Sequence, residues 1–302
     1  MLKFKNFWIL SLLTVFINLK GNAQLRDIYE NMQFTHGGFI NPANIAVDPT
    51  INFDLSLFAF QPQSKSIEGL YNSISLLANK ALGKNGNIGL LLDYNQNGAF
   101  EQVNTAFKYG YLVKLSEKMD IGIGLSAGIQ KSTINTASIQ DPLNQNQFVP
   151  DPVIQDFNNR PVQIYTDLGV NFRWTGLRIQ GVYYNITKAQ GNTQETQPKY
   201  YFSLDYNLEL DRIGVRAFGG LVGYDDKVNS NKIIFGFRLF YNPIGFSAYY
   251  NTQGKITTNI DLRLINQLSL DLGYVFGPYY SNPVYGDKGN ISLGAKYTIF
   301  KK

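Results

Sequence analysis

Apolar side chains recur at every second position in segments of about ten residues, and this alternation runs through most of the chain. Two clear examples are QLSLDLGYVFGP at 267–278 and NISLGAKYTIF at 290–300. Successive residues of a strand point to opposite faces of a sheet, so each segment carries one apolar stripe and one stripe of polar or small residues. A long series of such strands predicts an all-β protein whose sheet separates two different environments.

Fourteen such segments can be placed on the sequence, an even number, as in the single-chain barrels of the bacterial outer membrane. The segment that begins near residue 66 also fits a helical pattern. The fourteen segments begin near residues 51, 66, 87, 101, 119, 163, 177, 199, 212, 232, 244, 255, 267 and 290.

The connections between these segments differ in length. Short ones fall at 116–118, 175–176, around 211 and 242–243, and longer polar ones at 80–86, 95–100, 132–162, 188–198, 225–231 and 278–289. The Pro-, Gln- and Asn-rich part of the longest, residues 141–161, is expected to be an exposed loop. Short turns at one end and long loops at the other are typical of outer-membrane barrels, whereas a soluble β-sandwich, the alternative, needs no such asymmetry. Residues 51–302 are therefore predicted to form a transmembrane antiparallel β-barrel of about 14 strands.

Composition excludes several classes of function. Charged residues make up 16% of the chain, below the roughly 25% of ordinary soluble domains, and aromatic residues make up 14%. There is no cysteine and one histidine, His36, so disulfides, thiolate metal sites and multi-histidine sites are excluded. No acidic cluster has the spacing of a calcium loop. We expect no catalytic residue, no metal and no cofactor, and an outer-membrane enzyme is the least favoured hypothesis.

The N-terminus carries two early lysines, then an apolar run, then small residues at 21 and 23. This order predicts a secretory signal peptide over residues 1–23, and the run is shorter than the roughly 20 residues of a membrane anchor, the alternative. Because the leader contains three lysines and no acid, its removal lowers the net charge from +5 to +2, so no nucleic-acid partner is expected. The mature chain is predicted to lie in the outer membrane and to contact its lipids.

Charged residues of the predicted strands fall on the polar stripe, which faces the lumen of a barrel. Both signs are present, which indicates a network of ion pairs. Two interpretations are open: the charges fill a polar lumen, as in any such barrel, or they line a path for a substrate. The candidate lumen charges are Arg173, Arg216, Arg238, Asp261, Arg263 and Asp271.

Residues 24–50 precede the first strand and are predicted to form a plug or a periplasmic segment. Within them the stretch GGFINPANIAVDP (37–49) fits neither a helix nor a strand pattern. Pro42 favours an extended Asn41, whose side chain is expected to bond its own local backbone. The segment either closes the barrel mouth or contacts periplasmic partners. The candidate residues for either role are Phe34, Phe39, Asn41, Pro42 and Ala43.

The Phe39–Ala43 stretch, the preceding aromatic segment, the barrel length and the absence of cysteine resemble the PorP/SprF family of outer-membrane proteins. That resemblance implies a role in the type IX secretion system and gliding motility of the Bacteroidetes, with envelope components and secreted surface proteins as partners. FadL-type channels for hydrophobic compounds share the Asn-Pro-Ala tripeptide and a similar strand number. A passive channel for small or hydrophobic solutes is therefore the alternative function, although the N-terminal segment here is shorter than the usual hatch of that family.

Overall fold

A computed structural model of the protein describes residues 37–46, 51–62, 72–97, 100–134, 152–184, 186, 200–210, 213–223, 231–252, 254–276 and 290–300. Fourteen strands follow two short helices, α3 (Gly37–Ile40) and the 3-10 helix η1 (Pro42–Ala46). The strands are β1 (Ile51–Pro62), β2 (Asn72–Leu82), β3 (Gly86–Asn97), β4 (Phe100–Ser116), β5 (Met119–Ile134), β6 (Gln163–Trp174), β7 (Leu177–Tyr183), β8 (Tyr200–Leu210), β9 (Ile213–Gly223), β10 (Lys232–Tyr241), β11 (Ile244–Asn251), β12 (Ile256–Ile265), β13 (Leu268–Phe276) and β14 (Asn290–Phe300).

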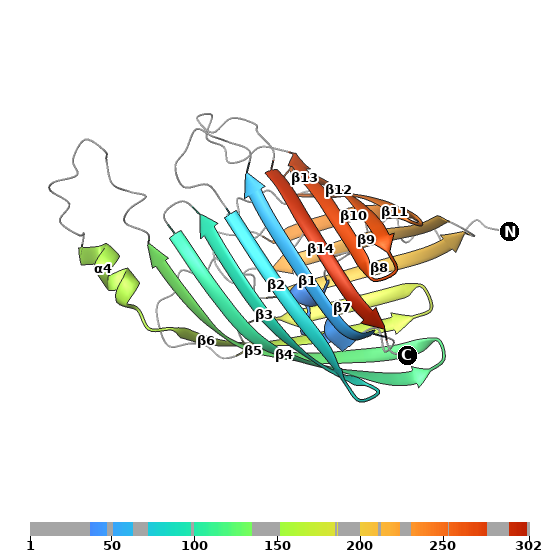
Figure 1. Cartoon of the computed structure of the whole chain (residues 1–302), viewed down its shortest axis with the longest axis horizontal. Coiled ribbons are helices and arrows are strands. Elements are labelled where there is room, and N and C mark those ends of the chain that lie inside the picture. The colour runs from blue at the N-terminus through green and yellow to red at the C-terminus, as the bar shows by residue number, and fades with distance from the viewer. Residues whose placement is uncertain are drawn as a thin grey trace.

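The strands form one closed antiparallel barrel in which each strand pairs with its neighbours in sequence and β1 pairs with β14 (Figure 1). Closure gives every strand edge a partner, which a lipid environment requires because no water is present there to satisfy free backbone groups. The predicted fold class and strand number are confirmed. No helix in the part of the chain that the structure describes has the length and apolar character needed to cross a membrane.

The two faces of the barrel wall follow the sequence alternation. In β8, Leu204 and Tyr206 are about half exposed, whereas Ser203 and Asp205, which alternate with them, are buried. β12 repeats the pattern, with Ile260 exposed beside a buried Asp261. The outer wall is therefore an apolar surface suited to lipid, and polar side chains face inward.

Three expectations about the connections were wrong. The stretch 80–86 was expected to be a long loop, but β2 continues to Leu82, a turn occupies Gly83–Asn85, and Gly83 takes a left-handed conformation with φ 68°. The polar residues near the end of β2 fit a loop as well as a strand. The stretch 95–100 was also expected to be a long loop, but β3 continues to Asn97 and β4 begins at Phe100. The third stretch, 141–161, contains helix α4 (Pro152–Asn159), which lies at the end of the barrel opposite the turn at Gly83–Asn85 (Figure 1). The Asn158 side chain fixes α4 by bonding both the N–H and the C=O of Ile134.

Residues 37–46, which we call the plug, lie inside the barrel (blue in Figure 1). The plug packs against β3, β4, β5 and β6. Its apolar side chains Phe39, Ile40 and Ile45 join inward-facing apolar residues of the wall in a buried cluster, which we call the lumen core. The wall residues of the lumen core are Leu77, Val182, Tyr184, Tyr201, Phe218, Val222, Ile234, Tyr249 and Val275.

Candidate functional site

Space for the plug comes from a row of glycines on the inner wall. Gly110 of β4 is paired with Gly124 of β5, which is paired in turn with Gly169 of β6. A Cβ on Gly124 would overlap the backbone of Pro42 and Ala43, and one on Gly169 would overlap the Asn41 side chain. The plug backbone therefore lies directly on the wall, at a distance that only glycine permits.

On one side of the glycine row, a buried lysine binds the end of the first plug helix. Lys108 of β4 is 2% exposed, and its Nζ donates to the carbonyl oxygens of Gly38 (2.7 Å) and Phe39 (3.0 Å). The Tyr184 hydroxyl donates to the carbonyl oxygen of Ile40 at 3.2 Å. These donors satisfy C-terminal carbonyls that a short helix cannot satisfy internally, and the ammonium is placed where a helix terminus favours positive charge.

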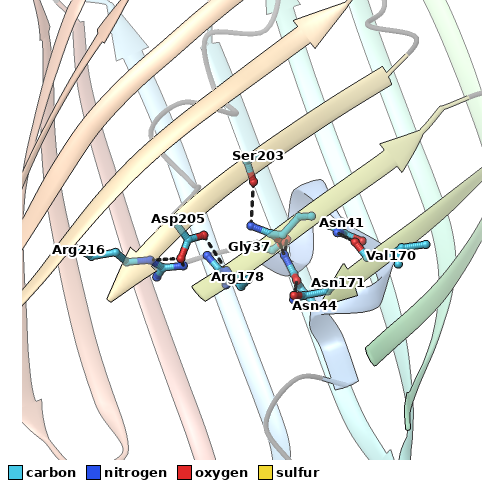
Figure 2. Close-up of polar contacts among 10 residues, drawn as sticks. Gly37, Asn41, Asn44, Val170, Asn171, Arg178, Ser203, Asp205 and Arg216 are labelled. Carbon is cyan, nitrogen blue, oxygen red and sulfur yellow. Dashed lines mark hydrogen bonds and ion pairs between the residues drawn. The ribbon is translucent and has the colours of Figure 1, made fainter. Parts of the chain in front are cut away.

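On the other side of the glycine row, amide side chains hold Asn44 (Figure 2). The Asn44 Nδ2 donates to Gln180 Oε1 at 2.7 Å and to the Gly37 carbonyl at 3.1 Å, while Asn171 Nδ2 donates to Asn44 Oδ1. Gln180 continues the chain of bonds to the Ser203 hydroxyl at 3.1 Å. Asn171, Gln180 and Ser203 are neighbours across β6, β7 and β8, so this network ties the plug to three strands.

The structure gives the predicted plug residues packing partners within the chain. The Asn41 Oδ1 accepts a bond from the Ala43 N–H at 2.9 Å, as the sequence predicts, and its Nδ2 donates to the Val170 carbonyl at 3.1 Å. Phe39, Pro42 and Ala43 are buried, and Phe34 lies outside the described residues. Contact between these residues and another protein stays a prediction.

A row of charged residues lies two positions beyond the amides, toward the short turns (Figure 2). Asp205 is 2% exposed and lies between two guanidinium groups, those of Arg178 (2.8 Å) and Arg216 (2.7 Å). Arg173 binds Asp120 through two hydrogen bonds of 2.7 Å each. The opposite charges on the inner wall are thus joined by direct ion pairs.

The remaining predicted lumen charges lie on β10, β12 and β13. Arg238 binds Asp261, which is directly opposite Asp271 on the neighbouring strand. The guanidinium groups of Arg238 and Arg263 each lie 5.3 Å from the centre of the Phe240 ring, within the range of a cation–π contact. All six predicted lumen charges are therefore on the inner wall.

The arginines of these pairs, with Arg263, Asp205 and Glu209, line a cavity of about 840 Å³ at the end of the barrel that carries the short turns. The turn residues Thr175, Gly176 and Asn242 form part of its rim. Short turns mark the periplasmic end of an outer-membrane barrel. The lumen core and the plug lie farther inside, so the cavity forms a periplasmic vestibule.

Sequence reasoning missed three residues that organise this interior: Lys108, Arg178 and Asp205. Each alternates with outward-facing apolar residues, such as Phe107 and Tyr109 beside Lys108, so the two-residue pattern was a sufficient signal for their inward direction. Their partners were not predictable, because pairing depends on the register between strands. Within the described ranges, no group of three or more His, Cys, Asp or Glu side chains is placed to hold a metal ion.

A comparison with protein-family models identifies the family of this chain. The model described as type IX secretion system membrane protein PorP/SprF matches residues 22–292, most of the chain. The chain belongs to the PorP/SprF family. No match was found among curated protein sequences. Membership places this barrel among membrane proteins of the type IX secretion system, in the outer membrane, as its closed barrel fold also indicates.

Solved structures similar to this PorP/SprF chain include monoaromatic hydrocarbon channels and toluene transporters. The CymD monoaromatic hydrocarbon channel is 13% identical with a TM-score of 0.55, covering 94% of this chain and 99% of that one. The toluene transporter TbuX of Ralstonia pickettii is 12% identical, with the same TM-score and coverage. The toluene transporter TodX of P. putida is 12% identical with a TM-score of 0.53, covering 86% and 92%. At these identities the similarity establishes the fold alone.

Proposed function

We propose that this chain is a non-enzymatic component of the type IX secretion machinery that helps export, or retain at the cell surface, specific secreted proteins. Its partners are other envelope components and the secreted proteins themselves, and its role extends to gliding motility. It reaches the outer membrane after export directed by residues 1–23. The family match over residues 22–292 is the observation that carries this proposal.

The interior of the barrel supports the same role. The plug is fixed by Lys108, by the glycine row and by the Asn44 network, and the lumen core fills the space beside it. A lumen that holds a fixed segment in this way suits a protein that acts through its surfaces, whereas a solute channel needs a continuous path.

Deletion of the gene should abolish surface display of one or a few secreted proteins and leave the other outer-membrane proteins in place. Proteomics of shaved cell surfaces measures this, with the wild-type gene on a plasmid as the control. If the deleted strain displays the same proteins at the same levels as its parent, the secretion role is wrong.

The second candidate is a passive channel for small or hydrophobic solutes, which the shared Asn-Pro-Ala tripeptide and the fold of the hydrocarbon channels favour. Planar bilayers containing the purified protein distinguish the two. Because the plug and the lumen core lie inside the lumen and are packed together, we expect no steady conductance above that of protein-free bilayers. Steady conductance, or uptake of toluene into vesicles that depends on the protein, would favour the channel.

A further inference from the structure

The vestibule at the periplasmic end has an unusual concentration of arginine. Among the described residues that line it are five arginines from five different strands, against two acidic residues, Asp205 and Glu209. The arginines are Arg173 of β6, Arg178 of β7, Arg216 of β9, Arg238 of β10 and Arg263 of β12. A lumen that only needs to be polar can be lined by any mixture of polar side chains. The excess of arginine in this lining therefore points to a ligand.

The carboxylates of the wall neutralise these arginines only in part. Asp205 is shared between Arg178 and Arg216. The Arg238 Nε is buried and has no hydrogen-bond partner among the described residues, although its Nη2 binds Asp261. The Arg263 side chain is exposed, and its guanidinium group lies over the Phe240 ring. The exposed Arg263 guanidinium is therefore available to a ligand at this concave site.

We propose that this vestibule binds an acidic peptide segment of a protein partner that approaches from the periplasm. Arg173, Arg178 and Arg238 form ion pairs with aspartates, and the Arg173–Asp120 pair has the two-bond geometry typical of arginine with a carboxylate. The cavity of about 840 Å³ is within the usual range for ligand sites and exceeds what a single small anion would occupy. The Phe240 ring also lines it, so a peptide with acidic and apolar side chains fits its chemistry.

Binding can be measured with the full chain in a neutral detergent and a fluorescein-labelled hexaglutamate peptide as the probe. Fluorescence anisotropy should show saturable binding that weakens as salt is raised, because the attraction between exposed charges is screened. Arg263→Glu should weaken binding about tenfold or more, since a like charge then faces the peptide. Arg263→Lys keeps the charge but loses the planar guanidinium group. Its affinity for hexaglutamate should therefore lie between those of the wild type and of Arg263→Glu.

Lys118→Glu is the matched control, because Lys118 lies in an exposed turn at the same end of the barrel and its change in charge is identical. It should leave hexaglutamate affinity almost unchanged, and both variants should unfold in urea at the wild-type midpoint. Absence of binding by the wild type, or equal loss in both variants, overturns the proposal. Competition by tripolyphosphate that is stronger than that of unlabelled hexaglutamate would assign the site to phosphate groups instead of a peptide.

The identity of the partner rests on the proposed secretion function, but the binding does not. Normal surface display in the deleted strain together with Arg263-dependent hexaglutamate binding would refute the secretion role and leave the vestibule site standing. Defective display in the deleted strain, with no hexaglutamate binding, would refute the vestibule site alone.

Discussion

Replacing Gly124 with valine should expel the plug from the lumen and convert a silent barrel into a conducting one. Gly124 is the middle glycine of the row beneath the plug, and a Cβ there would overlap backbone atoms of Pro42 and Ala43. Backbone atoms cannot rotate away as a flexible side chain can. Overpacking of this kind costs about 3 kcal/mol, which raises the population of undocked plug roughly 100-fold.

Single-channel recording in planar bilayers measures the effect, and Gly219→Val is the matched control. Gly219 of β9 also lies in a membrane strand, but a Cβ built on it meets nothing within 4 Å, so valine there should leave the barrel silent. Gly110→Ala provides a milder change, because its Cβ would lie 2.8 Å from a side-chain atom of Ile45, which can shift.

The conductance of the three variants should follow the order Gly124→Val, Gly110→Ala, Gly219→Val, from highest to lowest. A folded Gly124→Val barrel that conducts no more than Gly219→Val would mean that the lumen core closes the barrel without the plug. The role given to the glycine row would then be wrong.

The barrel wall was predictable from the sequence because its physical cause is local. A strand that faces lipid on one side must alternate at every second residue, so segments such as 267–278 indicate both their structure and their orientation. Arg173, Arg216 and Asp261 were placed on the inner wall by this rule alone. The alternation is a weaker guide at strand ends, where a long loop was expected in place of the turn at Gly83–Asn85. It gives no information about loops, so it did not predict α4.

The binding surface for the plug was not predictable from the sequence because it depends on the register between paired strands. Gly110, Gly124 and Gly169 are scattered over about 60 residues of sequence, and they form a row only once β4, β5 and β6 are paired. The same holds for Lys108 and Asn44, whose polar side chains have partners more than 60 residues away. The sequence predicts the direction of each side chain, and the register between strands decides what it meets.

The second large effect is expected at Asp205, the carboxylate shared by Arg178 and Arg216. Changing it to asparagine keeps the side-chain shape but leaves two guanidinium groups close together without their common counter-charge. Breaking a buried ion pair in this way costs about 3 to 5 kcal/mol. Urea unfolding in detergent micelles, followed by tryptophan fluorescence, should show this decrease in the free energy of unfolding.

Two further variants separate the loss of charge balance from other causes. Asp120→Asn removes the partner of Arg173 in a pair that is more exposed, with 30% and 19% of the two side chains accessible, so its cost should stay below about 1 kcal/mol. The double variant Asp205→Asn/Arg216→Gln should be more stable than Asp205→Asn, because a single guanidinium then remains where two repelled each other. If the double variant were less stable than the single one, Arg216 would stabilise the wall by packing, and the charge row could not be the reason that β7, β8 and β9 hold together at the vestibule.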